Sequence, residues 1–453
     1  MTRILLAGIL FGLALPVAFT QTNIVLIMAD DVGCEPIGIY GGQRWKTPHI
    51  DALAKDGIRF NHCYSMPVCH PSRICLMTGK YPFRFNAEWG SFPRDEETHS
   101  LGAVLRRCGY RTAIAGKWQL CLMKNDRMQP RRMGFDEWCL FGWHEGARFH
   151  DPMIYQNGQL RSDTAGKYGP DAYVDFLSDF MERSKNAKQP FFAYYSMALA
   201  HDVTDDIPTQ VPYAPGKDRW MNYGEMIQSL DKMVGRVVRK LNDLQLREDT
   251  IIIFTGDNGT AVRSRLRYNR NGKYEYEQVY SIQHGQRVPG GKGTLLDIGT
   301  NVPLIVNWPG KIKAGSRSDA LVDFSDWLPT LVEIAGGHVE RQIDGCSFAP
   351  LLFEADSLPA RKFAFAEGRG KRAWVRTQQY KLYNNGQYFD ISVDPNEKSE
   401  VDPNEKSEVD PNEKNEVDPN EKNELTETAG DAAEKHELLE TALKQLDLPW
   451  NKK

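Results

Sequence analysis

The arrangement of this chain follows from the stretch Val68-Cys69-His70-Pro71-Ser72-Arg73-Ile74-Cys75-Leu76-Met77-Thr78-Gly79-Lys80. Pro71 is favoured in the first turn of a helix and Gly79 is the residue type that commonly ends one, so the stretch predicts a short helix that begins near Cys69. The unpaired N–H groups and the dipole at such an N-terminus favour an anion, and Arg73 lies one turn further on. The stretch therefore predicts a site for a negatively charged group.

Continuous apolar runs on either side of this stretch predict buried strands. Residues 24–29 form one run and residues 251–254 form another. Runs of this kind suit strands of a parallel sheet that is covered on both faces. Further strands are predicted at residues 112–115, 191–195 and 302–306.

Helical periodicity alternates with these strands. The clearest helix is predicted at residues 224–246, where apolar residues recur every three or four positions. The alternation over residues 22–355 predicts an α/β fold with a mostly parallel central sheet flanked by helices. In such sheets, sites form beyond the carboxyl ends of the strands. Six polar residues fall at these ends: Asp30, Asp31, Lys117, His201, Asp257 and Asn258.

The pattern Cys-x-Pro-Ser-Arg, which begins at Cys69 and is followed by Met77-Thr78-Gly79, resembles the signature of the sulfatases. In that family the cysteine is converted after translation to formylglycine, whose hydrated aldehyde is the nucleophile. The pattern alone leaves open that Cys69 is a buried core cysteine, as cysteines usually are. The resemblance spans most of residues 22–355 and implies the alkaline-phosphatase-like fold.

The resemblance also implies a metal site. Its ligands would be Asp30, Asp31, Asp257 and Asn258, together with Cys69. Hard cations prefer oxygen ligands, so Ca²⁺ is expected and Mg²⁺ is the alternative. Either the pair Asp30-Asp31 or the pair Asp257-Asn258, taken alone, is also typical of a turn at the end of a strand, where Asp and Asn are common.

The remaining matches imply a catalytic role for Cys69 and for four further residues. Arg73, Lys117 and Lys292 would neutralise the oxygens of a sulfate ester and stabilise the charge of the transition state. His201 would protonate the departing alcohol as a general acid. Lys117, His201 and Lys292 would also bind the substrate.

Gln119 departs from the family pattern. Many sulfatases carry histidine two residues after the lysine, where this chain has Gln119. Glutamine can hydrogen-bond a formylglycine hydroxyl, which implies a substrate-binding role, but it cannot accept the proton. The base for sulfate release is therefore open, and His284 and His70 are candidates by position only.

The N-terminal residues predict export. Residues 1–20 contain one cation and an apolar run that ends in a small polar segment, which is typical of a secretory signal peptide. A membrane-spanning helix needs about 20 apolar residues, and this run is shorter. We expect a secreted or periplasmic protein with no membrane association after cleavage. If Cys69 is converted, an odd number of the eight cysteines remains, so at least one stays unpaired.

The pattern changes in residues 356–453, which predict a smaller C-terminal subdomain with a short antiparallel sheet and a helix at residues 430–446. Within it, residues 393–424 are four copies of Val-Asp-Pro-Asn-Glu-Lys-(Ser/Asn)-Glu. Each copy has three acids and one lysine, so the array carries −8 in a chain whose net charge is −4. One apolar residue per copy cannot form a core, so a solvated surface loop is expected. Calcium binding by the acids is the alternative.

These observations predict a calcium-dependent sulfuric ester hydrolase that cleaves an aryl sulfate or a sulfated carbohydrate. The alternatives are a phosphonate or phosphodiester hydrolase of the same superfamily, and a sulfatase-like binding protein that has lost turnover. The expected partners are the ester and the enzyme that generates formylglycine, and no nucleic acid is expected.

The segment between Asn258 and Lys292 bears on the choice of substrate, because it contains a basic cluster. Such a cluster would favour a polyanion such as a sulfated polysaccharide, or it could form a solvated hairpin. Its cations are Arg263, Arg265, Arg267, Arg270, Lys273 and Arg287, against Glu275 and Glu277.

Overall fold

The computed structural model describes residues 22–85, 87–142, 145–202, 222–268, 274–353, 361–402 and 419–449. Three predicted features fall outside these residues. They are the signal peptide at residues 1–20, the domain boundary at residues 355–356, and residues 403–418 of the octapeptide array.

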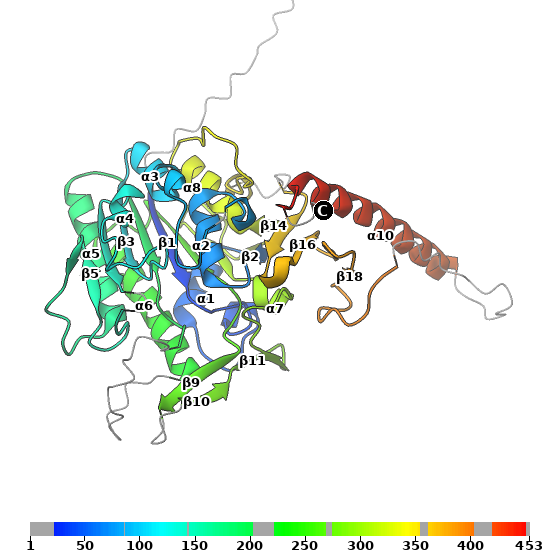
Figure 1. Ribbon diagram of the computed structural model, residues 1–453, viewed down its shortest axis with the longest axis horizontal. Coiled ribbons are helices and arrows are strands. Elements are labelled where there is room, and N and C mark those ends of the chain that lie inside the picture. The colour runs from blue at the N-terminus through cyan, green and yellow to red at the C-terminus, as the bar shows by residue number, and fades with distance from the viewer. Residues whose placement is uncertain are drawn as a thin grey trace, which may run out of the picture.

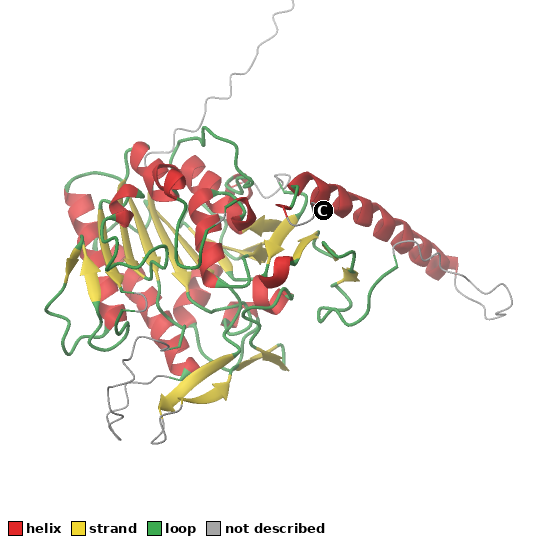
Figure 2. Cartoon of the chain, in the orientation of Figure 1, coloured by secondary structure: helices red, strands yellow, loops and turns green. Residues whose placement is uncertain are grey.

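A ten-stranded sheet forms the centre of the molecule, in the order β14-β2-β13-β8-β1-β7-β3-β4-β5-β6 (Figures 1 and 2). The five neighbours from β8 to β4 run parallel, whereas β13 is antiparallel to β8 and β2, and β5 and β6 are antiparallel at one edge. The prediction of a mostly parallel sheet is therefore confirmed. The strands are β1 (Asn23–Ala29), β2 (Ile58–Tyr64), β3 (Arg111–Gly116), β4 (Glu137–Phe141), β5 (Ile154–Gln156), β6 (Gln159–Leu160), β7 (Phe191–Ser196), β8 (Thr250–Gly256), β13 (Leu304–Asn307) and β14 (Ser316–Asp323).

Helices cover both faces of this sheet. Strand β1 shows why, because its side chains alternate between two hydrophobic clusters: Leu26 and Met28 pack on one side, and Val25 and Ile27 on the other. The first cluster is completed by α2 (Cys69–Thr78), α3 (Leu101–Arg107) and α8 (Trp327–Ile334). The second is completed by α1 (Pro48–Lys55), α5 (Gly169–Asn186) and α6 (Tyr223–Asp243). Short helices lie at α4 (Gln129–Arg132), α7 (Asp297–Thr300) and α9 (Pro350–Phe353).

A four-stranded antiparallel sheet follows near the C-terminus. Its strands are β15 (Ala364–Glu367), β16 (Ala373–Arg376), β17 (Tyr380–Tyr383) and β18 (Tyr388–Asp390). The prediction of a short antiparallel sheet in this part of the chain is therefore confirmed. Phe365 and Trp374 belong to the same hydrophobic cluster as β1 and α2, so the small sheet shares the main core. Helix α10 (Pro419–Leu446) packs on β16 and β17 and begins earlier than predicted (Figure 1).

The octapeptide array was predicted to form a solvated surface loop, but its two described ends have regular contacts or structure. The first copy contacts the small sheet: the Glu397 carboxylate lies 2.6 Å from Lys381 Nζ and accepts a hydrogen bond of 2.6 Å from Tyr383. The last copy enters α10 at Pro419. A repeat with little apolar surface can therefore still be ordered where one of its acids finds a buried cation.

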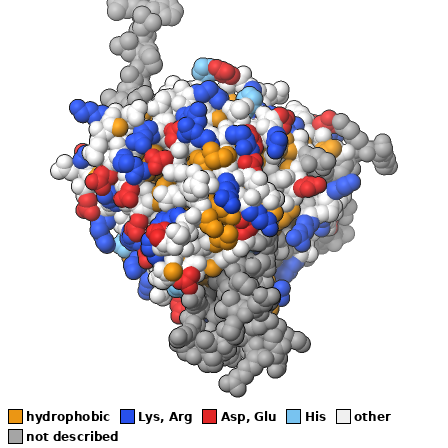
Figure 3. Space-filling view, turned by 60° about the vertical axis from the view of Figure 1, so that its left-hand side comes forward, with side chains coloured by type: hydrophobic (Ala, Val, Ile, Leu, Met, Phe, Trp, Pro, Cys, Tyr) orange, Lys and Arg blue, Asp and Glu red, His pale blue; other side chains and the backbone are white. Residues whose placement is uncertain are grey.

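Two antiparallel hairpins lie between β8 and β13 in the chain: β9 (Arg263–Tyr268) with β10 (Tyr274–Gln278), and β11 (Tyr280–Gln283) with β12 (Gln286–Pro289). Among the described residues, no helix is long and apolar enough to cross a membrane. All eight cysteines are described, and none forms a disulfide. On the face shown in Figure 3, basic and acidic side chains are interspersed.

Candidate active site

Polar side chains converge at the carboxyl ends of the central strands. Asp30 and Asp31 follow β1, and Asp257 and Asn258 follow its parallel neighbour β8. Lys117 follows β3, and His201 lies beyond β7. Parallel neighbours end at the same edge of a sheet, so residues far apart in the sequence meet there.

Cys69 at the start of α2 completes a compact group of potential metal ligands. One ligand atom each from Asp30, Cys69 and Asp257 lies within 4.8 Å of the others, and all three residues are buried. Asn258 Nδ2 donates to Asp31 Oδ1 at 2.9 Å, while the buried Asn258 Oδ1 has no hydrogen-bond partner. Carboxylate oxygens with one free amide oxygen are a donor set that fits a hard divalent cation.

Three buried or half-buried cations face the three carboxylates. Lys117 Nζ lies 2.9 and 2.7 Å from the two Asp30 oxygens, and Lys292 Nζ lies 2.7 Å from Asp31. Arg73 donates to Asp257 Oδ2 at 2.7 Å. The charges of these side chains cancel, so an added divalent cation would make the site positive and suited to an anionic ester.

The backbone at the strand ends is shaped for these contacts. Gly116 has φ +104°, and a Cβ there would lie 2.0 Å from the carbonyl oxygen of Ser196, so the last residue of β3 must be glycine. Ser196 Oγ donates to the Lys117 carbonyl at 2.6 Å and accepts from Arg73. Ser196 therefore holds the Lys117 turn and helix α2 together.

Burial and charge shift the pKa values of the carboxyls in opposite directions. Burial and the negative charge of Asp30 raise the pKa of Asp257 to about 7, although Arg73 opposes this. Burial would also raise the pKa of Asp30 and Asp31, but Lys117 beside Asp30 and Lys292 beside Asp31 hold both below the ordinary value.

His201 is the histidine closest to this charge cluster. Its Nδ1–H donates to the carbonyl oxygen of Asp202 at 2.8 Å, and Nε2 lies 3.8 Å from Asp31 Oδ2. In the neutral ring, Nε2 therefore carries the lone pair, and the ring must be cationic before Nε2 can donate. Burial and the charge of Lys292 lower the pKa of His201, while Asp31 opposes this.

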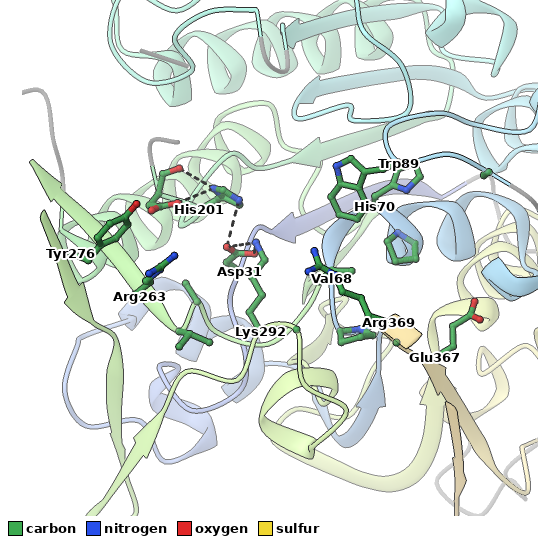
Figure 4. A pocket seen from close by; sticks show the side chains of 18 residues that line it. Asp31, Val68, His70, Trp89, His201, Arg263, Tyr276, Lys292, Glu367 and Arg369 are labelled. Atoms are coloured by element: carbon green, nitrogen blue, oxygen red, sulfur yellow. Dashed lines mark hydrogen bonds and ion pairs between the residues drawn. The ribbon is translucent and has the colours of Figure 1, made fainter. Parts of the chain in front are cut away.

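A cavity of about 630 Å³ opens above the cluster (Figure 4). Asp31, His201 and Lys292 reach it, whereas Cys69, only 2% exposed, lies deeper. Its other walls are formed by Trp89 and His70 on one side, Arg263 and Tyr276 of the β9–β10 hairpin on another, and Arg369 of the C-terminal sheet. Neither Trp89 nor Arg369 was predicted from the sequence as a site residue. Only the basic run Arg369-Gly370-Lys371-Arg372 offered a local signal.

Gln119 follows β3 two residues after Lys117. Its side chain is buried and its Oε1 has no partner, and like Cys69, Arg73 and Lys117 it is not among the residues that line the cavity. The two histidines that the sequence offered as a base lie in different places, and His70 is the one that lines the cavity. His70 Nε2 contacts the Ser91 carbonyl oxygen at 2.7 Å, and burial lowers its pKa to about 4. His284 lies in the β11–β12 turn against Gly41.

Comparisons with known proteins agree with this geometry. The sulfatase family profile matches residues 22–337, and the C-terminal profile of N-sulphoglucosamine sulphohydrolase matches residues 291–431. The chain belongs to the sulfatase family. This sulfatase is a sulfuric ester hydrolase, as the sequence predicted.

Relatives of the sulfatase span most of its length. N-acetylgalactosamine-6-sulfatase of Canis lupus familiaris is 30% identical over 430 residues, which cover 86% of this chain and 78% of that protein. Arylsulfatase A of Homo sapiens is 30% identical over 435 residues, which cover 87% and 80% respectively. The crystal structure of Ps i-CgsB in complex with k-i-k-neocarrahexaose matches with a TM-score of 0.67 at 26% identity, over 84% of this chain and 88% of that chain. Structural neighbours share the α/β architecture, which confirms the alkaline-phosphatase-like prediction.

Proposed function

We propose that this sulfatase hydrolyses a sulfate ester of a carbohydrate, with formylglycine formed from Cys69 as the nucleophile and a bound divalent cation, Ca²⁺, at the adjacent carboxylates. One observation carries the proposal: Cys69 shares a buried 4.8 Å cluster with Asp30 and Asp257, at the point where Arg73 pairs with Asp257 and Lys117 with Asp30. A cysteine that only fills the hydrophobic core would not need buried carboxylates and cations around it.

Asp30, Asp31, Asp257 and Asn258 would hold the cation. When bound, the cation supplies electrostatic stabilisation of developing negative charge, and formylglycine supplies a hydroxyl nucleophile. A hard cation would also take up the free Asn258 Oδ1 and lower the pKa of the Asp257 carboxyl by its charge.

The chain's own cations would orient the ester. Arg73 and Lys117 are 2% exposed and pair with Asp257 and Asp30, while Lys292 reaches into the cavity. Charged donors held in a buried site stabilise a transition state strongly, because they need no reorganisation during the reaction. Ser196 keeps Arg73 and the Lys117 turn in register by its two hydrogen bonds.

His201 would protonate the leaving alcohol through Nε2. Its Nδ1–H is already committed to the Asp202 carbonyl, so the ring orientation is fixed and only Nε2 faces the cavity. The pKa of His201 is lowered by burial and Lys292, and an anionic ester between the two would offset the charge of Lys292 and favour the cationic ring.

A carbohydrate fits the cavity walls. Trp89 is 52% exposed at the rim beside His70, with ring centroids 5.2 Å apart, and an exposed indole is a suitable surface for a sugar ring. The relatives named for N-acetylgalactosamine 6-sulfate and the neighbour that holds a carrageenan oligosaccharide support the same class of substrate. We also propose that the protein is exported through residues 1–20 and matured by a formylglycine-generating enzyme.

Mass spectrometry of the tryptic peptide that spans residues 60–73, from protein made in its native host, tests the nucleophile. We expect an aldehyde in place of the Cys69 thiol. The same preparation should hydrolyse N-acetylgalactosamine 6-sulfate or a small aryl sulfate faster than the matched phosphate ester, and a chelator should abolish turnover until Ca²⁺ is restored. An unmodified thiol in an active preparation would contradict the proposal.

A further inference from the structure

Arg369 is a cation of the cavity wall that the proposed chemistry does not use. It lies between β15 and β16 and lines the cavity above the catalytic cluster. Lys292 is paired with Asp31, whereas Arg369 makes no hydrogen bond or ion pair with any residue in the described part of the chain. Its guanidinium is therefore available to an external anion.

The position of Arg369 is fixed by the small sheet. Gly368 N–H donates to the Arg372 carbonyl at 2.8 Å and closes the loop, and Trp374 Nε1–H donates to the Leu295 carbonyl at 2.9 Å. Leu295 follows Lys292 closely in the chain, so the loop that carries Arg369 is held against the loop that carries Lys292. Figure 4 places Arg369 on the opposite side of Asp31 from Arg263.

Arg369 also lines a second cavity, of about 380 Å³. The two cavities share three lining residues, Gly293, Gly368 and Arg369, so they lie side by side and Arg369 stands between them. The second cavity is walled by polar and aromatic side chains that include Arg372, Tyr383 and Gln387. Its one acid, Glu397, is already paired with Lys381. The second cavity therefore adjoins the one above the reactive cluster and has a composition that suits a second sugar.

We propose that Arg369 is a specificity-determining residue that binds an anionic group, sulfate or carboxylate, on the sugar next to the one that carries the reacting ester. The inference rests on the proposed carbohydrate substrate. The reacting sulfate would be bound by Arg73, Lys117 and Lys292, each of which pairs with a carboxylate of the catalytic cluster. Arg369 pairs with none of these carboxylates and lines the second cavity, so it is free to bind a different anionic group. A planar guanidinium binds sulfate and carboxylate with two parallel hydrogen bonds.

Matched substrates test this role. The free monosaccharide N-acetylgalactosamine 6-sulfate is compared with an oligosaccharide in which the same unit adjoins a sugar bearing a carboxylate. For Arg369→Ala we expect kcat/KM to fall about tenfold on the oligosaccharide and to stay within about twofold on the monosaccharide. Arg369→Lys should restore part of the loss, because it keeps the charge but not the paired geometry.

Arg317→Ala is the matched control, since Arg317 is exposed on β14 and lines neither cavity. An equal loss on both substrates would place Arg369 at the reacting sulfate and overturn the inference, and so would no loss on either. Calorimetric binding of the oligosaccharide to Cys69→Ala protein, with and without Arg369→Ala, decides the role without turnover. The inference is supported if the oligosaccharide binds Cys69→Ala protein and binds the double variant more weakly. It is contradicted if the two proteins bind the oligosaccharide equally, or if neither binds it. A wild-type enzyme that cleaves neither ester contradicts the proposed substrate instead.

Discussion

At the scale of single residues, the site combines groups that are costly to bury with partners that offset the cost. Asp30, Asp31 and Asp257 each have a cation within 2.7 Å. Glu35 does not: it is 4% exposed, and its Oε1 has no hydrogen-bond partner. Burial raises its pKa to about 7, and only a hydrogen bond with Thr260 and one with its own backbone oppose the shift.

Glu35→Gln should therefore change the pH dependence of stability. A carboxyl with a raised pKa in the folded state stabilises fully below its unfolded pKa, and that contribution is lost as pH rises through about 7. We expect the free energy of unfolding of the variant to equal that of the wild type near pH 4.5 and to exceed it by about 1–3 kcal/mol at pH 8. Urea unfolding at several pH values measures this. A constant difference between variant and wild type at every pH would contradict the assignment.

His201→Ala tests the general-acid role through the leaving group. If Nε2 protonates the departing alcohol, its loss should lower kcat about 10²–10⁴-fold on a sugar sulfate, whose alcohol leaves poorly. A nitrophenyl sulfate leaves without a proton, so its hydrolysis should fall far less. Steady-state kinetics on both esters provides the measurement. Equal losses would assign His201 to binding of the sulfate rather than to proton transfer.

At the scale of elements, buried ion pairs join the small sheet to the segments around it. Lys381 on β17 is fully buried and contacts Asp297 at 3.1 Å as well as Glu397 at 2.6 Å. The first octapeptide copy is thus joined to α7 and to the sheet that carries Arg369. An ion pair this deep is expensive to break from one side, because the remaining charge stays buried.

Glu397→Gln should therefore destabilise the protein by about 2–4 kcal/mol. It removes one of the two carboxylates that contact the buried Lys381, and the other, Asp297, is shared with Arg376. Glu400→Gln is the matched control. Glu400 is exposed and accepts one hydrogen bond from the neutral Gln387, which a glutamine can replace. Its expected effect is within about 0.5 kcal/mol. Chemical denaturation of both variants supplies the comparison, and equal effects would show that Glu397 is not the anchor of the array.

At the scale of the whole molecule, charge is distributed unevenly. The chain carries −4 overall and its octapeptide array carries −8, so the remainder is positive. Arg263, Arg369 and Lys292 line the cavity together with three acids, Asp31, Asp202 and Glu367. Asp31 is paired with Lys292, and burial raises the pKa of Glu367 to about 8, so Arg263 and Arg369 are opposed mainly by Asp202. Cations in a hollow raise the local concentration of an anionic polymer more than that of a small monoanion.

Added salt should therefore slow the enzyme on a sulfated oligosaccharide more than on a small aryl sulfate. The Debye length shortens from about 10 Å at 0.1 M to about 3 Å at 1 M, which screens distant charges but not the groups in contact with the ester. The ratio of the two kcat/KM values across this range is the measurement. If salt lowers kcat/KM equally for both substrates, the cations of the cavity wall do not attract the oligosaccharide preferentially, and the prediction is contradicted.

The sequence by itself determined the features that depend on local pattern. Apolar runs specified β1 and β8, the helical period specified α6, and polar residues at the strand ends placed Asp30, Asp257 and Lys117 at one edge. Strands β2, β4 and β18 were missed, because their alternating or short segments resemble loops when only neighbours in the sequence are considered.

Only the tertiary structure decided which distant segments form the cavity. Trp89 and Arg369 come from segments that did not predict a site, and their place in the cavity wall follows from how separate elements pack. Ser196 ends the predicted strand β7, but its contacts with Arg73 and the Lys117 carbonyl depend on packing in the same way. The role of Gln119 stays a prediction: its buried side chain does not line the cavity, but neither do those of Arg73 and Lys117. The pattern of residues along the chain specifies a helix or a strand, because it acts through neighbours in the sequence. The walls of the cavity depend instead on contacts between residues that lie hundreds of positions apart.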